Sequence, residues 1–250
     1  MSKQLLLISN STNPGEDYLA WPRPHISKFL KSTTVKRILF IPFAGVNLTP
    51  EGVHPSYEMY TKKVSKVFNE LGYEIYSIVD EENPIKAVED AESIMIGGGN
   101  TFFLVYMLYK WKLMEPIRRK ILNGTPYIGW SAGSNVACPS LRTTNDMPII
   151  EPESFNTLNI VPFQINPHYL DTNPVGHGGE TREQRIMEFL AVNPLIKVVG
   201  LREQTALIVN DDNLELVGTR QMRYFEFGMQ PKEFNPGDNL EILMNLKMTV

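Results

Sequence analysis

The sequence predicts an α/β fold in which helices flank an open, mostly parallel β-sheet, with antiparallel strands added near the C-terminus. Two observations point to this fold. In the first half of the chain, short and uniformly apolar segments alternate with stretches of helical period, as parallel strands buried on both faces do. Towards the C-terminus, short apolar segments follow one another across tight polar turns, which is typical of antiparallel strands. The 250 residues, 42% of them hydrophobic, suffice for a sizeable core, and we expect one domain over residues 1–250.

Five strands are expected in the first half of the chain. Each is an apolar run that stops at turn-forming or polar residues, such as Asn10, Gly45 or the glycines that follow residue 96. The expected strands are Gln4–Ser9, Arg37–Phe43, Tyr73–Val79, Ser93–Ile96 and Pro126–Trp130. Strands that alternate with helices connect by right-handed crossovers, so these five are expected in one parallel sheet.

Two stretches between these strands have helical character. Over residues 57–71, apolar residues recur at steps of three and four, and Gly72 ends the segment. This pattern predicts an amphipathic crossover helix. The stretch 101–122 is very apolar at first and ends before Gly124, so it is also expected to be helical.

The second half of the chain is less regular. Five prolines divide the segment 145–178 into loops and short extended pieces, and loops of this kind commonly carry functional residues. A helix is expected from Thr181, where a capping box with Gln184 marks its start, to about Val192. The expected strands after it, which we take to be antiparallel, are Ile196–Leu201, Ala206–Val209, Leu214–Val217 and Arg223–Phe227.

Charge and composition argue against several classes of function. The 28 acidic and 24 basic residues are dispersed, and no basic run is long enough to follow a phosphate backbone, so we expect no nucleic-acid partner. The apolar stretch after Met1 is too short for a signal peptide, and no long apolar span is present, so we expect no membrane partner. The single cysteine, Cys138, fits a reducing compartment, and we expect a cytoplasmic protein. The sequence leaves the assembly state open, a homodimer included.

A G-x-S-x-G pattern, Gly129-Trp130-Ser131-Ala132-Gly133, stands between the fifth strand and a segment that can begin a helix. A sharp strand-to-helix turn strains the serine backbone and needs neighbours without bulk. Ser131 Oγ would then lie exposed at the carboxyl end of the sheet, with the N–H of Ala132 directed to where an oxyanion forms. A serine that only caps a helix between closely packed glycines would match the same pattern. The position after a fifth strand favours the nucleophile.

A glycine-rich turn, Gly97-Gly98-Gly99-Asn100-Thr101, follows the fourth strand and is expected at the same sheet edge as Ser131. The N–H groups of Gly98 and Gly99 are candidates for the other half of an oxyanion hole. The segment lacks both the glycine spacing of dinucleotide-binding turns and the Gly-Lys-Ser/Thr ending of phosphate loops. We therefore expect no nucleotide at this turn.

Four histidines are available as the base for a serine nucleophile: His25, His54, His168 and His177. We select His168, because proline stiffens the chain before it and a general base must be held at hydrogen-bond distance in one tautomer. His177 stands among glycines, and we expect His25 and His54 in polar loops next to prolines. A surface or structural role is the expectation for these three.

The imidazole needs a carboxylate to orient it, and two acidic residues are candidates. Glu203 follows the strand Ile196–Leu201 at its carboxyl end, and Asp146 lies in a polar segment shortly after the nucleophile. Most isolated acidic side chains are solvated surface charges, and the sequence alone does not separate these two. The histidines are neither spaced i, i+4 nor grouped with the cysteine, so we expect no metal ion and no cofactor.

Several longer motifs occur in order along the chain. They are Leu6–Thr12 (LLISNST), Phe40–Gly45 (FIPFAG), Gly97–Phe102 (GGGNTF), Ile128–Gly133 (IGWSAG), Arg142–Ile149 (RTTNDMPI), Gln164–His168 (QINPH) and Gly179–Arg185 (GETREQR). Together they closely resemble the peptidase E family of α-aspartyl dipeptidases, serine peptidases related to cyanophycinase. The resemblance extends from residue 6 to about residue 203, and the residues from Gln221 onward carry no motif of the family.

The resemblance implies hydrolysis of dipeptides with a free amino-terminal aspartate, on a fold similar to that of class I glutamine amidotransferases with serine in place of their cysteine. Ser131 and His168 then match the family's nucleophile and base. The family has been described with either Glu203 or Asp146 as the third member. We favour Glu203 as the partner of the histidine and keep Asp146 as an essential site residue. Arg182 is the cation that the resemblance favours for the substrate's aspartate, and a helix residue paired with a nearby glutamate explains it equally well.

Two other functions stay open on the sequence. A hydrolase of β-aspartyl or cyanophycin-type peptides would use the same serine chemistry, whereas a non-catalytic binding module on an amidotransferase-like scaffold would leave Ser131 unmodified. With Glu203 as the acid, the chain order is Ser, His, acid. That order differs from the Ser, acid, His order of α/β-hydrolases.

Overall fold

The computed structural model describes residues 3–176 and 178–244. It contains a seven-stranded sheet in the order β3-β2-β4-β5-β1-β8-β9, and the first five of these strands run parallel. The parallel strands are β1 (Gln4–Ile8), β2 (Arg37–Ile41), β3 (Glu74–Ser77), β4 (Ile94–Ile96) and β5 (Tyr127–Trp130). Each lies within a strand predicted from the sequence, and the α/β fold class with a mostly parallel sheet is confirmed.

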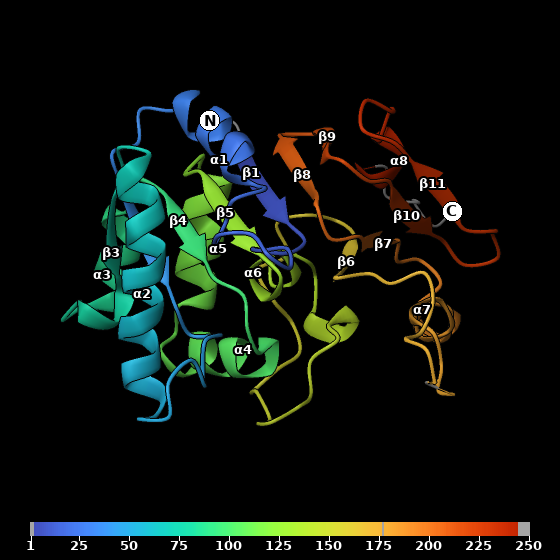
Figure 1. Cartoon of the computed structure of the whole chain (residues 1–250), viewed down its shortest axis with the longest axis horizontal. Coiled ribbons are helices and arrows are strands. Elements are labelled where there is room, and N and C mark those ends of the chain that lie inside the picture. The colour runs from blue at the N-terminus through green and yellow to red at the C-terminus, as the bar shows by residue number, and fades with distance from the viewer. Residues whose placement is uncertain (1–2, 177, 245–250) are drawn as a thin grey trace.

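The parallel strands are apolar throughout because helices cover both faces of the sheet (Figure 1). Along β2, for example, Phe40 packs in the core of one face and Leu39 in the core of the other. The first face is covered by α1 (Arg23–Lys31) and α2 (Val53–Glu70). The opposite face is covered by α3 (Pro84–Asp90), α4 (Thr101–Lys110), α5 (Met114–Leu122) and α6 (Ala132–Asn135). Two 3₁₀ turns, η1 (Ile78–Asp80) and η2 (Leu141–Thr143), complete this part.

The helices differ from the sequence expectation in two places. The stretch 101–122 forms two helices, because the chain turns at Lys112, whose φ is 56°. His25 lies in α1 and His54 in α2, so the expectation that these histidines occupy polar loops is wrong. The neighbouring prolines stand in the first turn of each helix, where a missing N–H breaks no intrahelical hydrogen bond.

The C-terminal half extends the first sheet and builds a second one, of order β11-β10-β7-β6. The second sheet is only partly antiparallel, since β7 pairs with β10 in that way but with β6 in parallel. Packed against it is α7 (Arg182–Val192), which begins at the predicted capping box of Thr181 and Gln184. The elements of this half are β6 (Gln164–Pro167), β7 (Val198–Leu201), β8 (Thr205–Asn210), β9 (Asn213–Gly218), β10 (Met222–Phe225), β11 (Lys232–Phe234) and α8 (Glu241–Met244).

The two sheets meet at the end of β1, through the buried side chain of Ser9. Ser9 Oγ donates a hydrogen bond to the carbonyl of Leu201 at the end of β7 (2.7 Å) and accepts one from the N–H of His168 after β6 (3.0 Å). The carboxyl ends of β1, β6 and β7 are thereby tied together next to that of β5, which pairs with β1. Among the described residues, no helix is both long and apolar enough to cross a membrane.

Candidate active site

Ser131 occupies a sharp turn between β5 and α6. Its φ of 52° and ψ of −111° are sparsely populated by residues other than glycine. A Cβ on Gly129 would lie 2.5 Å from the carbonyl oxygen of Gly133, and a Cβ on Gly133 would lie 2.1 Å from that of Ile96. Both neighbours must therefore be glycine, and the turn is the strained one that the G-x-S-x-G pattern predicts.

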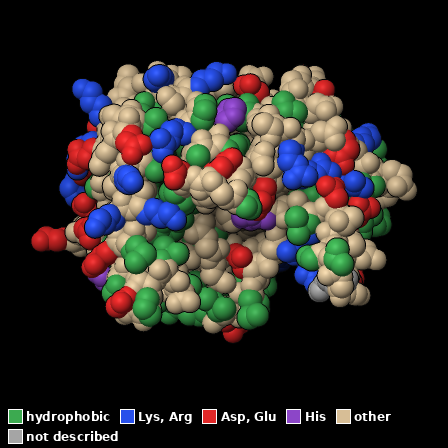
Figure 2. Space-filling model, in the orientation of Figure 1, with side chains coloured by type: hydrophobic (Ala, Val, Ile, Leu, Met, Phe, Trp, Pro, Cys, Tyr) green, Lys and Arg blue, Asp and Glu red, His purple; other side chains and the backbone are tan. Residues whose placement is uncertain are grey.

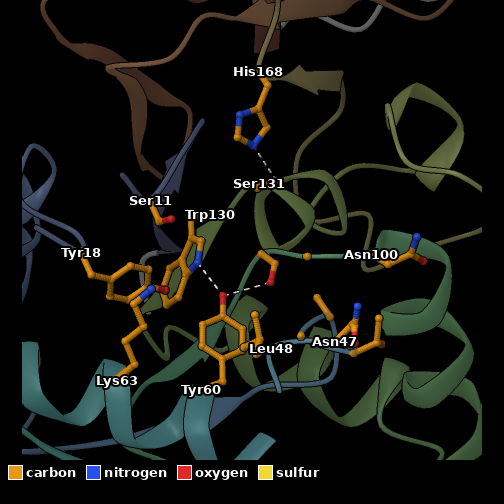
Figure 3. Close-up of a pocket in the computed structure, with 15 residues that line it drawn as sticks. Ser11, Tyr18, Asn47, Leu48, Tyr60, Lys63, Asn100, Trp130, Ser131 and His168 are labelled. Atoms are coloured by element: carbon orange, nitrogen blue, oxygen red, sulfur yellow. Dashed lines mark hydrogen bonds between the residues drawn. The ribbon is translucent and has the colours of Figure 1, made fainter. Parts of the chain in front are cut away.

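Three side chains from separate segments form a hydrogen-bonded line at this edge. His168 Nε2 lies 2.8 Å from Ser131 Oγ (Figure 3). His168 Nδ1 lies 2.8 Å from Glu203 Oε1. Ser131 follows β5, His168 follows β6 and Glu203 follows β7. With one ring nitrogen facing a hydroxyl and the other a carboxylate, the imidazole is arranged to accept a proton at Nε2 while Nδ1–H donates to Glu203.

The backbone around His168 is held by several hydrogen bonds. His168 itself has a φ of 53°, and its N–H donates a hydrogen bond to Ser9 Oγ. Asn145 Nδ2 donates to the carbonyl of Pro167 (2.6 Å), and the N–H of Tyr169 donates to the carbonyl of Leu201 (3.2 Å). The imidazole therefore projects from a fixed segment even though its side chain is 40% exposed.

The loop that carries Glu203 is anchored from both sides. Arg202, which is 6% exposed, forms ion pairs with Asp171 and with Glu233. These bonds lower the pKa of the Asp171 carboxyl and raise that of the guanidinium. On the other side, the N–H of Gln204 donates to Asn10 Oδ1 (2.9 Å). The buried arginine thus fixes Glu203 without contacting the imidazole.

Asp146 lies apart from the imidazole, at the start of α4. Its Oδ2 accepts hydrogen bonds from the N–H (2.7 Å) and the hydroxyl (2.5 Å) of Thr101 and from the hydroxyl of Thr144 (3.0 Å). An acidic side chain at a helix N-terminus is stabilised by the unpaired N–H groups and the helix dipole. Of the two candidate acids, the structure brings Glu203 and not Asp146 to His168.

The glycine turn after β4 lies directly against the nucleophile. A Cβ on Gly98 would be 2.9 Å from Ser131 Cβ, and a Cβ on Gly99, whose φ is 137°, would be 2.1 Å from the carbonyl oxygen of Ala44. Within the described part of the chain, the N–H groups of Gly98, Gly99 and Ala132 donate no hydrogen bond. Free donors beside a serine are what an oxyanion hole requires.

Tyr60, on α2, fixes the orientation of this turn. Its hydroxyl is fully buried, donates to the carbonyl of Gly98 (3.0 Å) and accepts from Trp130 Nε1 (2.9 Å) (Figure 3). Burial raises the pKa of Tyr60 to about 12, so the hydroxyl keeps its proton. Because the peptide is planar and trans, binding the Gly98 carbonyl directs the N–H of Gly99 away from Tyr60.

Replacing Tyr60 by phenylalanine should destabilise the protein and slow the reaction. The Tyr60→Phe variant leaves the Gly98 carbonyl and the Trp130 N–H without their partner, which costs about 1–3 kcal/mol of unfolding free energy. We expect kcat to fall roughly tenfold as the turn loosens. Urea denaturation and steady-state kinetics measure the two effects. Tyr57→Phe is the matched control, since the buried Tyr57 hydroxyl has no hydrogen-bond partner among the residues that the structure describes. A kcat for Tyr60→Phe equal to that of this control would contradict the role of Tyr60.

Ser131 and His168 open into a pocket of about 460 Å³. The space-filling view shows the surface hollowed between α4 and α7, two helices that contribute no residue to the lining of this pocket (Figure 2). Aromatic side chains form much of one wall. Besides Ser131 and His168, the residues that line the pocket include Ser11, Tyr18, Asn47, Leu48, Tyr60, Lys63, Asn100 and Trp130 (Figure 3). The volume is sufficient for a small peptide.

Arg182 does not line this pocket. It is the first residue of α7 and lines a smaller pocket of about 150 Å³, together with Asp146. The two pockets are neighbours, because Asp146 binds Thr101 and the adjacent Asn100 lines the Ser131 pocket. Within the described residues Arg182 forms no ion pair, whereas Glu183 pairs with Arg223. The alternative of an arginine paired with a neighbouring glutamate is therefore not what the structure shows.

His25 and His54 lie away from Ser131. His54 pairs with Glu58 on the surface of α2, and His25 contacts the ring of Trp21. His177 lies outside the described residues. In the described ranges, no group of three or more His, Cys, Asp and Glu side chains is arranged to hold a metal ion.

Sequence reasoning missed Ser9 and Tyr60. Ser9 ends an apolar strand like many surface serines, and nothing local marks it as buried. The apolar periodicity of residues 57–71 places Tyr60 only on the apolar face of its helix. The hydroxyl of Tyr60 is the feature that could have indicated its role, because a tyrosine on a buried helix face requires a hydrogen-bond partner.

Comparisons with known proteins match most of the chain. The model of peptidase family S51 matches residues 5–217. The chain is 52% identical over 244 residues to Peptidase E of Nostoc sp. (strain PCC 7120 / SAG 25.82 / UTEX 2576), covering 98% of each chain. It is 44% identical to Peptidase E of Shewanella sp. (strain MR-4), over 98% of this chain and 100% of that one. A crystal structure of a peptidase from an acI-B1 Actinobacterium has the same fold, with a TM-score of 0.69 and 18% identity over 95% of this chain and 96% of its own.

Proposed function

Because this chain belongs to peptidase family S51 and is thus a peptidase, we propose that it is a serine-type dipeptidase that cleaves dipeptides with an amino-terminal aspartate. The observation that carries the proposal is the line from Glu203 Oε1 through both ring nitrogens of His168 to Ser131 Oγ. We place the enzyme in the cytoplasm, where its one cysteine, the buried Cys138, stays reduced.

The reaction we propose proceeds through an acyl-enzyme. Ser131 Oγ gives its proton to His168 Nε2 and attacks the peptide carbonyl carbon, and the carbonyl electrons move onto the oxygen. The N–H groups of Ala132 and of Gly98 or Gly99 bind that oxyanion. The carbon–nitrogen bond then breaks, and His168 passes the proton to the leaving amine. Glu203 remains charged throughout, holds the imidazole in one tautomer and stabilises the imidazolium.

Water completes the cycle. His168, neutral again, removes a proton from a water molecule that attacks the ester on Ser131. A second oxyanion forms in this step, and the same backbone N–H groups bind it. When the bond to Oγ breaks, aspartate leaves, and the serine regains its proton from the imidazolium.

The preference for aspartate is assigned to Arg182. Its guanidinium has no ion-pair partner among the described residues and stands in a pocket next to that of Ser131. Burial lowers the pKa of Arg182, and nearby Arg185 adds to this effect while Asp146 opposes it. A guanidinium in these surroundings gains from a carboxylate that binds both of its nitrogens.

Arg182→Ala should remove the preference for aspartyl substrates. We expect the ratio of kcat/KM for Asp-Leu to that for Ala-Leu to fall roughly 10- to 100-fold, because a charge-assisted pair is lost. Arg118→Ala removes the same charge from a residue that lines neither pocket and should keep the wild-type ratio. An Arg182→Ala variant that still prefers Asp-Leu would exclude the arginine from specificity.

A substrate panel tests the proposed function as a whole. Purified wild type and Ser131→Ala are compared on α-aspartyl dipeptides, β-aspartyl dipeptides and arginine-linked aspartyl substrates. We expect only the wild type to be active, and with α-aspartyl dipeptides as its best substrates. Faster cleavage of β-aspartyl or arginine-linked substrates would contradict the proposal, since these are the substrates of related peptidases that use the same serine chemistry.

A further inference from the structure

The Ser131 pocket contains a charged side chain that the proposed mechanism does not use. Lys63, on α2, lines the pocket together with Ser131 and His168. Among the described residues that line it, Lys63 is the one that carries a full charge at neutral pH. It stands three residues after Tyr60 and therefore on the same side of the helix.

The Lys63 ammonium has no acidic partner in the described part of the chain. Its Nζ lies over the ring of Tyr18, 4.2 Å from the ring centroid. The face of an aromatic ring attracts a cation and holds it near one position. By contrast, Arg23 on α1 and Lys86 on α3 form ion pairs with Glu70 and Asp90. Lys63 is thus an exposed cation at the wall of the pocket, without an acidic partner among the described residues.

Lys63 and the Arg182 pocket lie on different sides of the nucleophile. In Figure 3, Lys63 and Tyr18 stand on one side of Ser131 and Asn100 on the other. Asn100 precedes Thr101, which binds Asp146 in the Arg182 pocket. If the aspartate before the cleaved bond occupies the Arg182 side, the residue after that bond extends towards Lys63.

We propose that Lys63 binds the free carboxylate of the residue after the cleaved bond and thereby restricts cleavage to dipeptides, an inference that rests on the proposed function. In a dipeptide, this carboxylate carbon is separated from the attacked carbon by only the amide nitrogen and one Cα, so the two lie about 4 Å apart at most. Lys63 lines the same pocket as Ser131, and its flexible stem lets the ammonium leave the Tyr18 ring for a carboxylate bound in that pocket. In a longer peptide the same position holds a neutral amide, and the ammonium stays unpaired.

The test compares a dipeptide with its C-terminal amide, Asp-Leu with Asp-Leu-amide, in three forms of the enzyme. For the wild type we expect kcat/KM to be about 10- to 100-fold higher for the free acid, mostly through a lower KM. Lys63→Gln should reduce this ratio to within about threefold of one. Lys62→Gln is the matched control, because it removes the same charge from the adjacent residue, which does not line the pocket, and it should keep the wild-type ratio.

Two results would overturn the role of Lys63: equal cleavage of acid and amide by the wild type, or an unchanged ratio in Lys63→Gln. The ratio is taken within each variant, so a general loss of folded enzyme cancels. A wild type that prefers another amino-terminal residue would refute the aspartyl specificity instead. The acid-to-amide comparison made with that residue then still decides the role of Lys63.

Discussion

Ser131→Ala is expected to lower kcat about 10⁴- to 10⁶-fold while the protein stays folded. The substitution removes only the hydroxyl oxygen, and the His168–Glu203 hydrogen bond does not depend on it. Without Oγ no acyl-enzyme forms, and the remaining rate comes from water attack in the same oxyanion hole. Steady-state kinetics on an aspartyl dipeptide measure the effect, and thermal unfolding checks the fold. Ser65→Ala, at a position that does not line the pocket, should retain wild-type kinetics.

A folded Ser131→Ala variant with a rate near that of the wild type would show that another group attacks the peptide. The candidates are few, because the pocket contains one other serine, Ser11, and no cysteine among its described lining residues. Cys138 is buried, and burial raises the pKa of its thiol. A large residual rate would therefore point to Ser11 or to direct attack by water.

Glu203→Gln should produce the second largest loss, about 10²- to 10⁴-fold in kcat. The amide keeps the size of the side chain but carries no charge, so it no longer stabilises the imidazolium and no longer selects the tautomer with the proton on Nδ1. The loop itself should stay in place, because its anchors are Arg202 and the N–H of Gln204. Steady-state kinetics measure the loss, and circular dichroism checks the fold.

Asp146→Asn is the matched comparison for this variant. Asp146 binds Thr101 and Thr144 and lines the Arg182 pocket. We expect its amide variant to act mainly on KM for aspartyl substrates and on the stability of the α4 N-terminus. A loss of kcat in Asp146→Asn that exceeds the loss in Glu203→Gln would contradict the assignment of Glu203 as the partner of His168.

The parts of the fold that were predictable are those that local chemistry dictates. A strand such as β2 is apolar at every position because it is covered on both faces, and that pattern is visible without a structure. The turn at Ser131 was predictable for a steric reason, since no side chain fits at Gly129 or Gly133. The start of α7 was predictable because both residues of its capping box, Thr181 and Gln184, lie within four positions of the sequence.

The parts that were not predictable depend on contacts between distant segments. The choice between Glu203 and Asp146 is made by the parallel pairing of β6 with β7, which brings the ends of both strands together. The residue that fixes this junction, Ser9, is more than 150 positions away from His168 in sequence. The break between α4 and α5 was missed because it depends on one residue, Lys112, in a left-handed conformation that its side chain does not favour.

Covalent capture of the nucleophile is the most direct test of a serine peptidase centred on residue 131. The wild type is mixed with a serine-directed acylating probe, and intact-mass spectrometry followed by peptide mapping locates the adduct. We expect one adduct, on Ser131, whose formation is slowed in Glu203→Gln and absent in Ser131→Ala. An active enzyme that gains no adduct, or one whose adduct persists in Ser131→Ala, would contradict Ser131 as the nucleophile.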